Sequence, residues 1–284
     1  VINSAMHQAQ TWLQYGLSIE ISINISPHHL LSDVFFSQLE TALNKYPDLD
    51  SEQFQIEVLE SEVISDVHQT ANIMKKCRRE LGVHFALDDF GTGYSSLSHL
   101  RDLPATTIKI DQTFVKNMLH EPNDSSIIDG IIGLAKSFGR NTIAEGVESN
   151  DHGLMLLMMG CRDAQGYGIA RPMPAKDIIN WIDNYIVNPS WINFDKTVLS
   201  STEASLELFR LTSNHWFDQF REGLIRDKDS IPNWTLKSHT KCQCGEWIKR
   251  AKIKKSFDPE WLFQLEEAHQ DIHLQATQLY NYAI

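Results

Sequence analysis

The chain has 284 residues, a formal charge of −12 at pH 7, and hydrophobic side chains at 42% of its positions. These ordinary globular values exclude a largely disordered chain, and the length allows one large domain or two smaller ones. No apolar run approaches the roughly 18 residues of a membrane-spanning helix, so we expect no membrane segment and a cytoplasmic protein.

Charge and composition both change near residue 200. Residues 1–200 carry 14 Lys and Arg against 25 Asp and Glu, whereas residues 201–284 carry 11 against 12. The acidic first part argues against DNA binding through a basic surface. Four of the seven tryptophans lie beyond residue 200. Two of the four cysteines also lie there, only two residues apart, which favours reduced thiols or metal ligands over a disulfide framework. The composition therefore predicts two domains.

Short β-like runs alternate with helical patterns through the first 170 residues. The runs are Ser18–Asn24, Gln53–Leu59, Val83–Asp88, Thr106–Ile110, Asn141–Glu145 and Arg162–Gln165. Apolar residues at three- and four-residue spacing predict helices over Phe35–Asn44, Ser65–Leu81 and Asp124–Phe138. This alternation predicts βαβ units with a mainly parallel sheet, either a (β/α)8 barrel or an open doubly wound sheet. Six strands are too few for a closed barrel. The chain begins at Val1 inside a helical pattern, so we expect that an N-terminal part with two strands is missing.

Polar side chains recur where these strands end. They are Asn24, Glu57 and Glu60, Asp88 and Asp89, Lys109 and Asp111, Glu145 and Gln165. In an α/β barrel the carboxyl ends of the strands meet on one face, where active sites are built. Any one of these residues could simply belong to a polar loop. Six successive strands that end this way favour a shared site.

The segment 87–97, LDDFGTGYSSL, resembles the EAL family of cyclic di-GMP phosphodiesterases. Other segments match the family in order and spacing over residues 1–185. They are INISP at 23–27, IEVLES at 56–61, IKID at 108–111, AEGVE at 144–148, and QGY at 165–167 followed by Pro172. The resemblance implies a TIM-like barrel over residues 1–187 that lacks its first strands.

The resemblance also implies an activity: hydrolysis of cyclic di-GMP to linear pGpG with two Mg²⁺ or Mn²⁺ ions. Carried onto this sequence, the metal ligands would be Asn24, Glu57, Asp88 and Asp89, and their oxygen donors suit such cations. Lys109 would hold the attacking water or the phosphate charge, and Glu145 would act as general base or metal-linked partner. The supporting residues would be Gln165 in the metal-site network, Glu60 bracing the loop 90–96, and Glu148.

The sequence departs from the family pattern in two places. The Glu-Ala-Leu segment that names the family, and with it one metal ligand, is absent, and Leu59 stands where the family has Thr. We therefore expect this fragment alone to be inactive, in a parent enzyme that could be membrane-anchored through its missing N-terminal region. The alternative is a noncatalytic cyclic di-GMP receptor or interaction module. A homodimer formed through the EAL barrel is expected in either case.

Residues 188–202 contain Asn-Pro-Ser and Ser-Ser-Thr and are predicted to be a linker. Amphipathic runs follow at 203–225, 244–253 and 258–282 without a strand pattern, which predicts an all-α bundle over residues 203–284. His269 and His273, four apart on the last run, would share one helical face. His215 and Cys242 would complete a tetrahedral Zn²⁺ site with them, since nitrogen and sulfur donors fit zinc.

This pattern resembles the chemoreceptor zinc-binding (CZB) domain. The matching residues are His215-Trp216, Cys242 with Gly245 and Trp247, and the pair His269 and His273. The resemblance implies one Zn²⁺ per chain and a zinc-sensing domain that regulates the phosphodiesterase. Cys242 has the matching offset and is preferred over Cys244, while His239 is expected beside the site or in solvent. A third interpretation, a plain zinc-binding scaffold, predicts bound zinc without nucleotide affinity.

Overall fold

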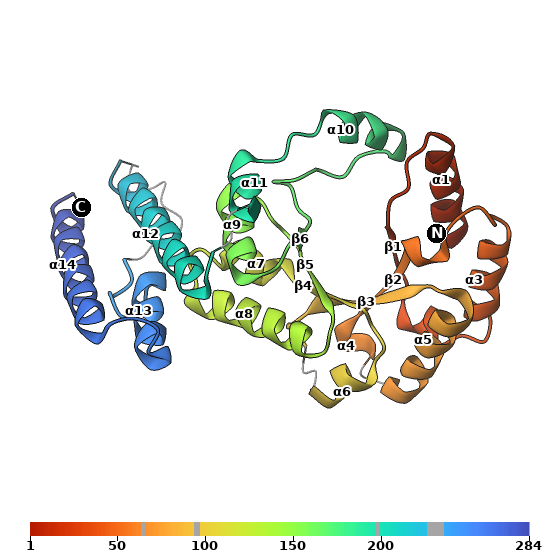
Figure 1. The fold of residues 1–284 in the computed structure, drawn as a ribbon, viewed down its shortest axis with the longest axis horizontal. Coiled ribbons are helices and arrows are strands. Elements are labelled where there is room, and N and C mark those ends of the chain that lie inside the picture. The colour runs from red at the N-terminus through yellow and green to blue at the C-terminus, as the bar shows by residue number, and fades with distance from the viewer. Residues whose placement is uncertain (64–65, 94–96, 197–198, 226–235, 284) are drawn as a thin grey trace.

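A computed structural model of the protein describes residues 1–63, 66–93, 97–196, 199–225 and 236–283. All six expected strands are present and form one parallel sheet in the order β1-β2-β3-β4-β5-β6. Their bounds are β1 Ile21–Asn24, β2 Phe54–Leu59, β3 His84–Phe90, β4 Thr107–Ile110, β5 Asn141–Ala144 and β6 Asp163–Ala164. A strand order that follows the sequence excludes the doubly wound alternative, in which the order reverses within the sheet. The sheet is instead the wall of a barrel whose edges, among the described residues, are β1 and β6 (Figure 1).

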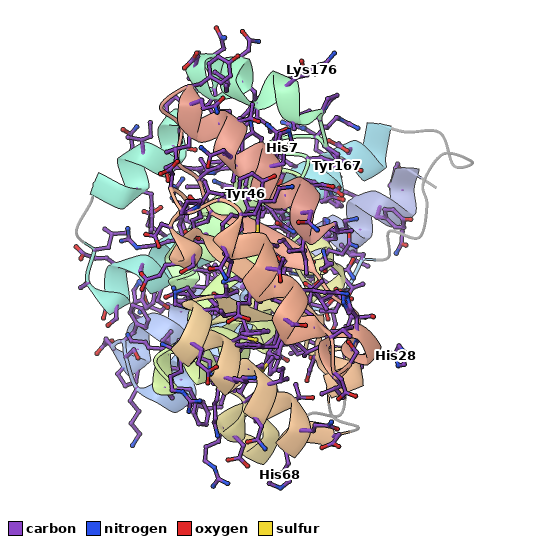
Figure 2. The ribbon with its side chains drawn as sticks, turned by 90° about the vertical axis from the view of Figure 1, so that its right-hand side faces the viewer. His7, His28, Tyr46, His68, Tyr167 and Lys176 are labelled. Atoms are coloured by element: carbon purple, nitrogen blue, oxygen red, sulfur yellow. The ribbon has the colours of Figure 1, made fainter. Side chains whose placement is uncertain are left out.

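Helices connect the strands and flank the sheet (Figure 1). Their bounds are α1 Ile2–Gln14, α2 Pro27–Leu30, α3 Phe35–Asn44, α4 Glu60–Val63, α5 Val67–Leu81, α6 Leu97–Asp102, α7 Gln112–Asn117, α8 Pro122–Ser137 and α9 Asn150–Met159. Helix α5 begins where Asp66 accepts a hydrogen bond from Gln69 N and ends at Gly82, whose φ of +76° closes the last turn. Helix α1 packs against α3, where the rings of His7 and Tyr46 lie 6.4 Å apart (Figure 2).

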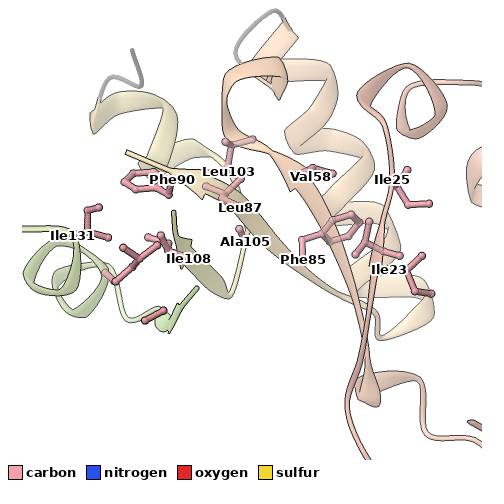
Figure 3. Close-up of a cluster of buried hydrophobic side chains, with 14 of the residues drawn as sticks. Ile23, Ile25, Val58, Phe85, Leu87, Phe90, Leu103, Ala105, Ile108 and Ile131 are labelled. Carbon is pink, nitrogen blue, oxygen red and sulfur yellow. The ribbon is translucent and has the colours of Figure 1, made fainter. Parts of the chain in front are cut away.

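The main core lies along the strands and under the helices. Figure 3 shows apolar side chains of neighbouring strands side by side, among them Ile23, Phe85, Leu87 and Ile108. All four residues of β4 are buried, and so are most of those in β3. Burial on both faces is typical of a parallel sheet covered by helices, and it explains why these strands read as nearly continuous apolar runs.

The segment after β6 crosses the open side of the sheet. It contains the short helix η3 Ala175–Asp177 and α10 Ile178–Asn184. The indole Nε1 of Trp12, in α1, donates a hydrogen bond to the Ala175 carbonyl at 3.2 Å. This contact joins the last part of the barrel segment to the first helix.

The expected linker is in part a helix. Residues Pro189–Lys196 form α11, and Trp191 donates from its indole nitrogen to the Asn150 carbonyl at 3.0 Å. The Trp191 ring also lies against Gly153, where a Cβ would come within 2.5 Å of it. The first half of the expected linker 188–202 therefore contains a helix that Trp191 anchors to α9.

The described residues of the C-terminal part include three helices. They are α12 Ser201–Ile225, α13 Gln243–Lys254 and α14 Pro259–Ala283. They share a small core of Trp247, Ile248, Ala251 and Leu262, and α12 also packs against α9. Among the described residues, no helix has both the length and the apolar character that crossing a bilayer requires.

Candidate active site and metal centre

A buried lysine stands at the centre of the strand ends. Lys109 Nζ, on β4, lies 2.7 Å from Glu57 Oε2 on β2 and 2.8 Å from Asp88 Oδ1 on β3. It also lies 2.7 Å from Glu145 Oε1, which follows β5. Burial opposes the charge of Lys109, but the hydrogen bonds to its three carboxylate partners outweigh burial and raise its pKa. Lys109 is therefore a permanently charged ammonium group among acids.

A bulge in β3 brings two adjacent carboxylates to the same site. Consecutive side chains of a strand normally point to opposite faces. The register with β4 shifts between Leu87 and Phe90, and Asp89 takes a left-handed conformation with φ +52°. Oxygen atoms of Asp88, Asp89 and Glu145 consequently lie within 4.8 Å of one another, a spacing that suits a cation.

Two of these acids hold protons more tightly than usual. Burial raises the pKa of Asp89 to about 6, and a hydrogen bond with Asp111 and the charges of Asp88 and Glu145 add to the effect. Burial also raises the pKa of Glu145, although Lys109 opposes the change. The negative charge of the crowded carboxylates exceeds the single positive charge of Lys109, so a divalent cation bound here would relieve the repulsion between the carboxylates. The oxygen donors present therefore fit Mg²⁺ or Mn²⁺.

A cavity of about 510 Å³ opens beside Glu145. Gln165, just after β6, donates from Nε2 to Glu145 Oε1 at 2.7 Å and fixes that carboxylate at the cavity wall. Tyr167, Arg171 and Trp181 line the same cavity, and the Arg171 guanidinium lies 4.7 Å from the centre of the Tyr167 ring. The sequence interpretation gave no role to Arg171 or Trp181, because neither lies at the end of a strand.

Glu60 reaches the loop that it was expected to brace. Its Oε2 accepts a hydrogen bond from Gly91 N at 2.9 Å. Gly91 has φ +104°, and a Cβ there would come within 2.9 Å of the Phe114 ring, so this position requires glycine. The rest of the expected motif, Tyr94 to Ser96, lies outside the described residues.

The remaining expected residues lie around this centre. Asn24 ends β1 opposite Glu57 and is exposed, at the edge of a second cavity of about 740 Å³. Glu148 also lines the cavity beside Glu145, where it pairs with Lys116 at 3.2 Å. Asp111 was noted at its strand end without a role. Its spacing of two from Lys109 was the available signal that both side chains share one face.

Comparison with known proteins identifies the family to which the first part of the chain belongs. The family model of the EAL domain matches residues 1–172. The chain belongs to the EAL domain family. It is 36% identical over 182 residues to "Cyclic di-GMP phosphodiesterase PA2567" of Pseudomonas aeruginosa, a match covering 64% of this chain and 31% of that protein. The chain thus spans about a third of the length of this relative.

Solved structures agree with this assignment. The EAL domain of Mycobacterium smegmatis DcpA matches with TM-score 0.61 and 34% identity, over 66% of this chain and 83% of that one. A structure described as "PaMucR Phosphodiesterase, c-di-GMP complex" matches with TM-score 0.60 and 32% identity, over 62% of this chain and 71% of that one. The parallel sheet of the EAL part thus has close structural relatives.

A second cluster of metal-binding groups lies in the C-terminal helices. Ligand atoms of Cys242, His269 and His273 lie within 4.8 Å of one another, and all three residues are buried. Cys242 Sγ lies 3.1 Å from His269 Nε2, at the N-terminus of α13, where it accepts from Gly245 N at 3.3 Å. Neither ring nitrogen of His273 has a hydrogen-bond partner among the described residues. A buried imidazole without a partner is costly, and a metal ion would satisfy it.

His215, the expected fourth ligand, is not part of this cluster. Its Nε2 lies 3.3 Å from His120 Nδ1, and its Nδ1 lies 3.8 Å from Asp151 Oδ2. The reason is the phase of α12, because Leu211, one turn before His215, packs in the core of the barrel segment. The next residue, Trp216, faces the cluster instead, with its ring centre 4.7 Å from that of His273.

The two neighbouring cysteines differ in surroundings. Cys244 Sγ lies 3.2 Å from Ser213 Oγ and 3.8 Å from Thr212 Oγ1, on α12, and it is outside the cluster of Cys242 with the histidines. Hydrogen bonding from Cys242, and from Ser213 and Thr212, lowers the pKa of Cys244 to about 7. The hydrogen bond to Cys244, together with burial, raises the pKa of Cys242.

Proposed function

We propose that the EAL part of this chain is the catalytic region of a cyclic di-GMP phosphodiesterase that forms linear pGpG. The observation that carries this proposal is the buried Lys109 among carboxylates of three other strands, beside a cavity large enough for part of a nucleotide. The names of its relatives, which include a cyclic di-GMP phosphodiesterase and a phosphodiesterase bound to c-di-GMP, give the substrate class.

Asp88 and Asp89, with Glu57 and Asn24 on the neighbouring strands, would hold one or two Mg²⁺ or Mn²⁺ ions. Bound ions of this kind supply an activated water and screen the charge of the phosphate. Residues of the chain would supply the remaining groups that the reaction needs. Lys109 stays charged and stabilises negative charge that develops on the phosphate oxygens.

Glu145 is placed to accept a proton. Its pKa is raised above that of an exposed carboxylate and so lies closer to neutral pH, which suits a general base. Gln165 Nε2 holds one of its oxygens and so sets the direction of the other. Glu60 holds the backbone of the neighbouring loop through Gly91 N.

The test is hydrolysis of cyclic di-GMP with Mg²⁺ or Mn²⁺, followed by chromatography of pGpG, in this chain and in a longer protein that contains it. Asp88→Asn removes a charged ligand and should lower metal-dependent turnover by about 100-fold or more. Glu80 is an exposed carboxylate on α5 that pairs with Arg79, so Glu80→Gln is the matched control and should leave turnover unchanged. Equal activity of the Asp88→Asn protein and the parent at limiting Mg²⁺ would overturn the assignment.

The second candidate is a noncatalytic cyclic di-GMP receptor, favoured by Leu59, which stands where the family has Thr. It predicts saturable binding of cyclic di-GMP by calorimetry and no pGpG at any metal concentration. Turnover by the longer protein, lost with Asp88→Asn, would exclude it.

We further propose that Cys242, His269 and His273 bind one Zn²⁺, with a fourth position for water or the nearby His239. The sulfur and imidazole donors, buried and within 4.8 Å of one another, are the set that zinc prefers. The carbonyl of His239 already accepts from Cys242 Sγ at 3.4 Å, so its side chain is close to the cluster.

Zinc would regulate the EAL part through the residues next to Cys242. Gln243 Nε2 donates to the Met118 carbonyl, and Ser125 Oγ donates to Gln243 Oε1 at 3.3 Å. Lys237 Nζ donates to the His120 carbonyl at 3.0 Å. These contacts hold residues 118–121, which link α7 to α8, and the first turn of α8. Asp111, the partner of Asp89, caps the N-terminus of α7, so a shift of Gln243 would reach the active site over a short path.

Zinc content per chain, measured by mass spectrometry, tests the zinc proposal. We expect one zinc in the parent, loss of zinc in Cys242→Ala, and retention in Cys244→Ala. Retention in His215→Ala is also expected, because His215 lies with His120. Zinc lost with Cys244→Ala and retained with Cys242→Ala would move the ligand to Cys244. Zinc binding without nucleotide binding in the same protein would support the plain zinc scaffold.

A further inference from the structure

A cavity of about 380 Å³ lies between α9, α11 and the end of β6, and we call it the α9–α11 cavity. Figure 1 shows α11 beside α9 at this end of the sheet. The α9–α11 cavity is separate from the cavity beside Glu145. Successive residues of a strand point to opposite faces, and Ala164 lines the α9–α11 cavity whereas Gln165 lines the other. The active site therefore does not account for this cavity.

The wall of the α9–α11 cavity is mainly apolar. Apart from Arg162, the described residues that line it are glycine, cysteine or apolar residues, such as Val147, Leu156, Leu157 and Ile169. The Cys161 thiol and the Trp191 indole N–H also belong to this wall, but both already donate to backbone carbonyls, at 3.4 Å and 3.0 Å. Water inside the cavity would find few side-chain partners, so an apolar ligand is favoured.

A positive charge lies where the α9–α11 cavity opens to solvent. Val187 and Ile192 line the cavity and are 41% and 37% exposed, so they mark its opening. Arg162 also lines the cavity and is exposed. The arginine guanidinium is always charged and has a geometry that matches carboxylates. An apolar interior with a cation at its opening is complementary to a ligand that has an apolar chain and an anionic end.

We propose that the α9–α11 cavity binds a free medium-chain carboxylate, with its chain against Leu156 and its carboxylate at Arg162. A cavity of about 150 Å³ takes one benzene molecule, so a cavity of about 380 Å³ has room for a chain of roughly eight to ten carbons. Largely apolar pockets of a few hundred Å³ are typical of small-molecule sites. This proposal does not depend on the phosphodiesterase activity or on zinc binding.

The α9–α11 cavity lies directly behind the segment that positions Glu145. Val147, in the cavity wall, donates from its backbone nitrogen to the Gln165 carbonyl at 3.0 Å, and its own carbonyl accepts from Gly168 N at 2.8 Å. The side chain of Gln165 in turn holds Glu145. A chain that fills the cavity contacts Val147, so a short path joins the bound carboxylate to the active site.

Calorimetric titration of this chain with carboxylates of increasing length tests the apolar interior. Each buried methylene should tighten binding about fourfold, so octanoate should bind about 16-fold more tightly than hexanoate. The gain should stop once the cavity is full, between decanoate and dodecanoate. Affinity that does not depend on chain length, or that rises unchanged as far as tetradecanoate, would overturn the proposal. Binding to phosphatidylglycerol vesicles without binding of free decanoate would indicate a membrane lipid and would also overturn it.

A substitution at the opening tests the location. Val187→Trp places an indole across the entrance and should abolish decanoate binding at the concentration that saturates the parent. Val34→Trp is the matched control, because Val34 is 51% exposed and lies outside the lining of the cavity. Both variants should keep the circular dichroism of the parent, since both valines are largely exposed. Equal decanoate affinity of the two variants would place the ligand elsewhere and would overturn the proposal.

Comparison of an acid with an alcohol tests the role of Arg162. An exposed ion pair is worth little, so Arg162→Gln should weaken decanoate binding by about two- to fivefold and leave 1-decanol binding unchanged. Arg221→Gln is the control, because Arg221 is an exposed arginine of α12 that pairs with Asp218. A decanoate affinity that is the same in Arg162→Gln and Arg221→Gln would overturn the assignment of the anionic end to Arg162.

Discussion

Among the described residues, Lys109 is the cation paired with Glu57, Asp88 and Glu145, and methionine in its place removes that charge. The side chain of Lys109 is 5% exposed, and its partners Glu57 and Asp88 lie within 2.8 Å of it. Methionine keeps the length of the side chain but leaves these carboxylates buried without a counter-charge. Breaking a buried ion pair by removing one partner costs about 3–5 kcal/mol. Since typical domains are stable by about 5–15 kcal/mol, the loss should be easy to measure.

Urea unfolding followed by circular dichroism measures this cost. Lys116→Met is the control, because Lys116 pairs with Glu148 at 3.2 Å on an exposed surface, where such a pair is worth about 0–1 kcal/mol. Burial raises the pKa of Glu145 and Lys109 opposes the change, so without Lys109 the pKa of Glu145 should rise further. Protonation of Glu145 then favours the folded state, so the deficit of Lys109→Met should shrink as the pH falls through that raised value.

Divalent cations should restore part of the lost stability, because they replace the missing positive charge. Two results would refute the reasoning. One is a loss for Lys109→Met no larger than for Lys116→Met. The other is a deficit that grows rather than shrinks as the pH is lowered from about 8 to about 5.

Three further predictions follow from single positions. Asp89→Asn should stabilise the metal-free protein above pH 6, where Asp89 is charged among acids, and the gain should shrink as the pH falls from about 6 toward the ordinary Asp pKa of about 3.9; urea midpoints at about pH 7 and about pH 4 decide this. Zinc affinity should weaken as the pH falls, because binding displaces the proton of Cys242, and zinc titration in buffers of different ionisation enthalpy should detect its release. Gly91→Ala should destabilise by about 1–3 kcal/mol, through its positive φ and the Phe114 ring, whereas Gly130→Ala, which meets no neighbour, should be neutral or stabilising.

The sequence by itself determined the elements and the chemistry of the EAL part. The apolar runs of the central strands β3 and β4 specified strands because these are buried on both faces, and Asp66 with Gly82 marked the ends of a helix. The placement of Glu57, Lys109 and Glu145 at successive strand ends predicted a shared site, since parallel strands align those ends by their hydrogen-bond register.

Only the tertiary structure decided how Asp88, Asp89, His215 and Trp191 are arranged. A bulge in β3 turned both Asp88 and Asp89 toward the site, against the alternation that a regular strand imposes. The docking of α12 on the barrel segment turned His215 to His120, away from Cys242. Local sequence specifies which side chains share a helix face, but the partner of that face depends on contacts between residues far apart in the chain. For the same reason Trp191, pressed against Gly153, converted part of an expected linker into a packed helix.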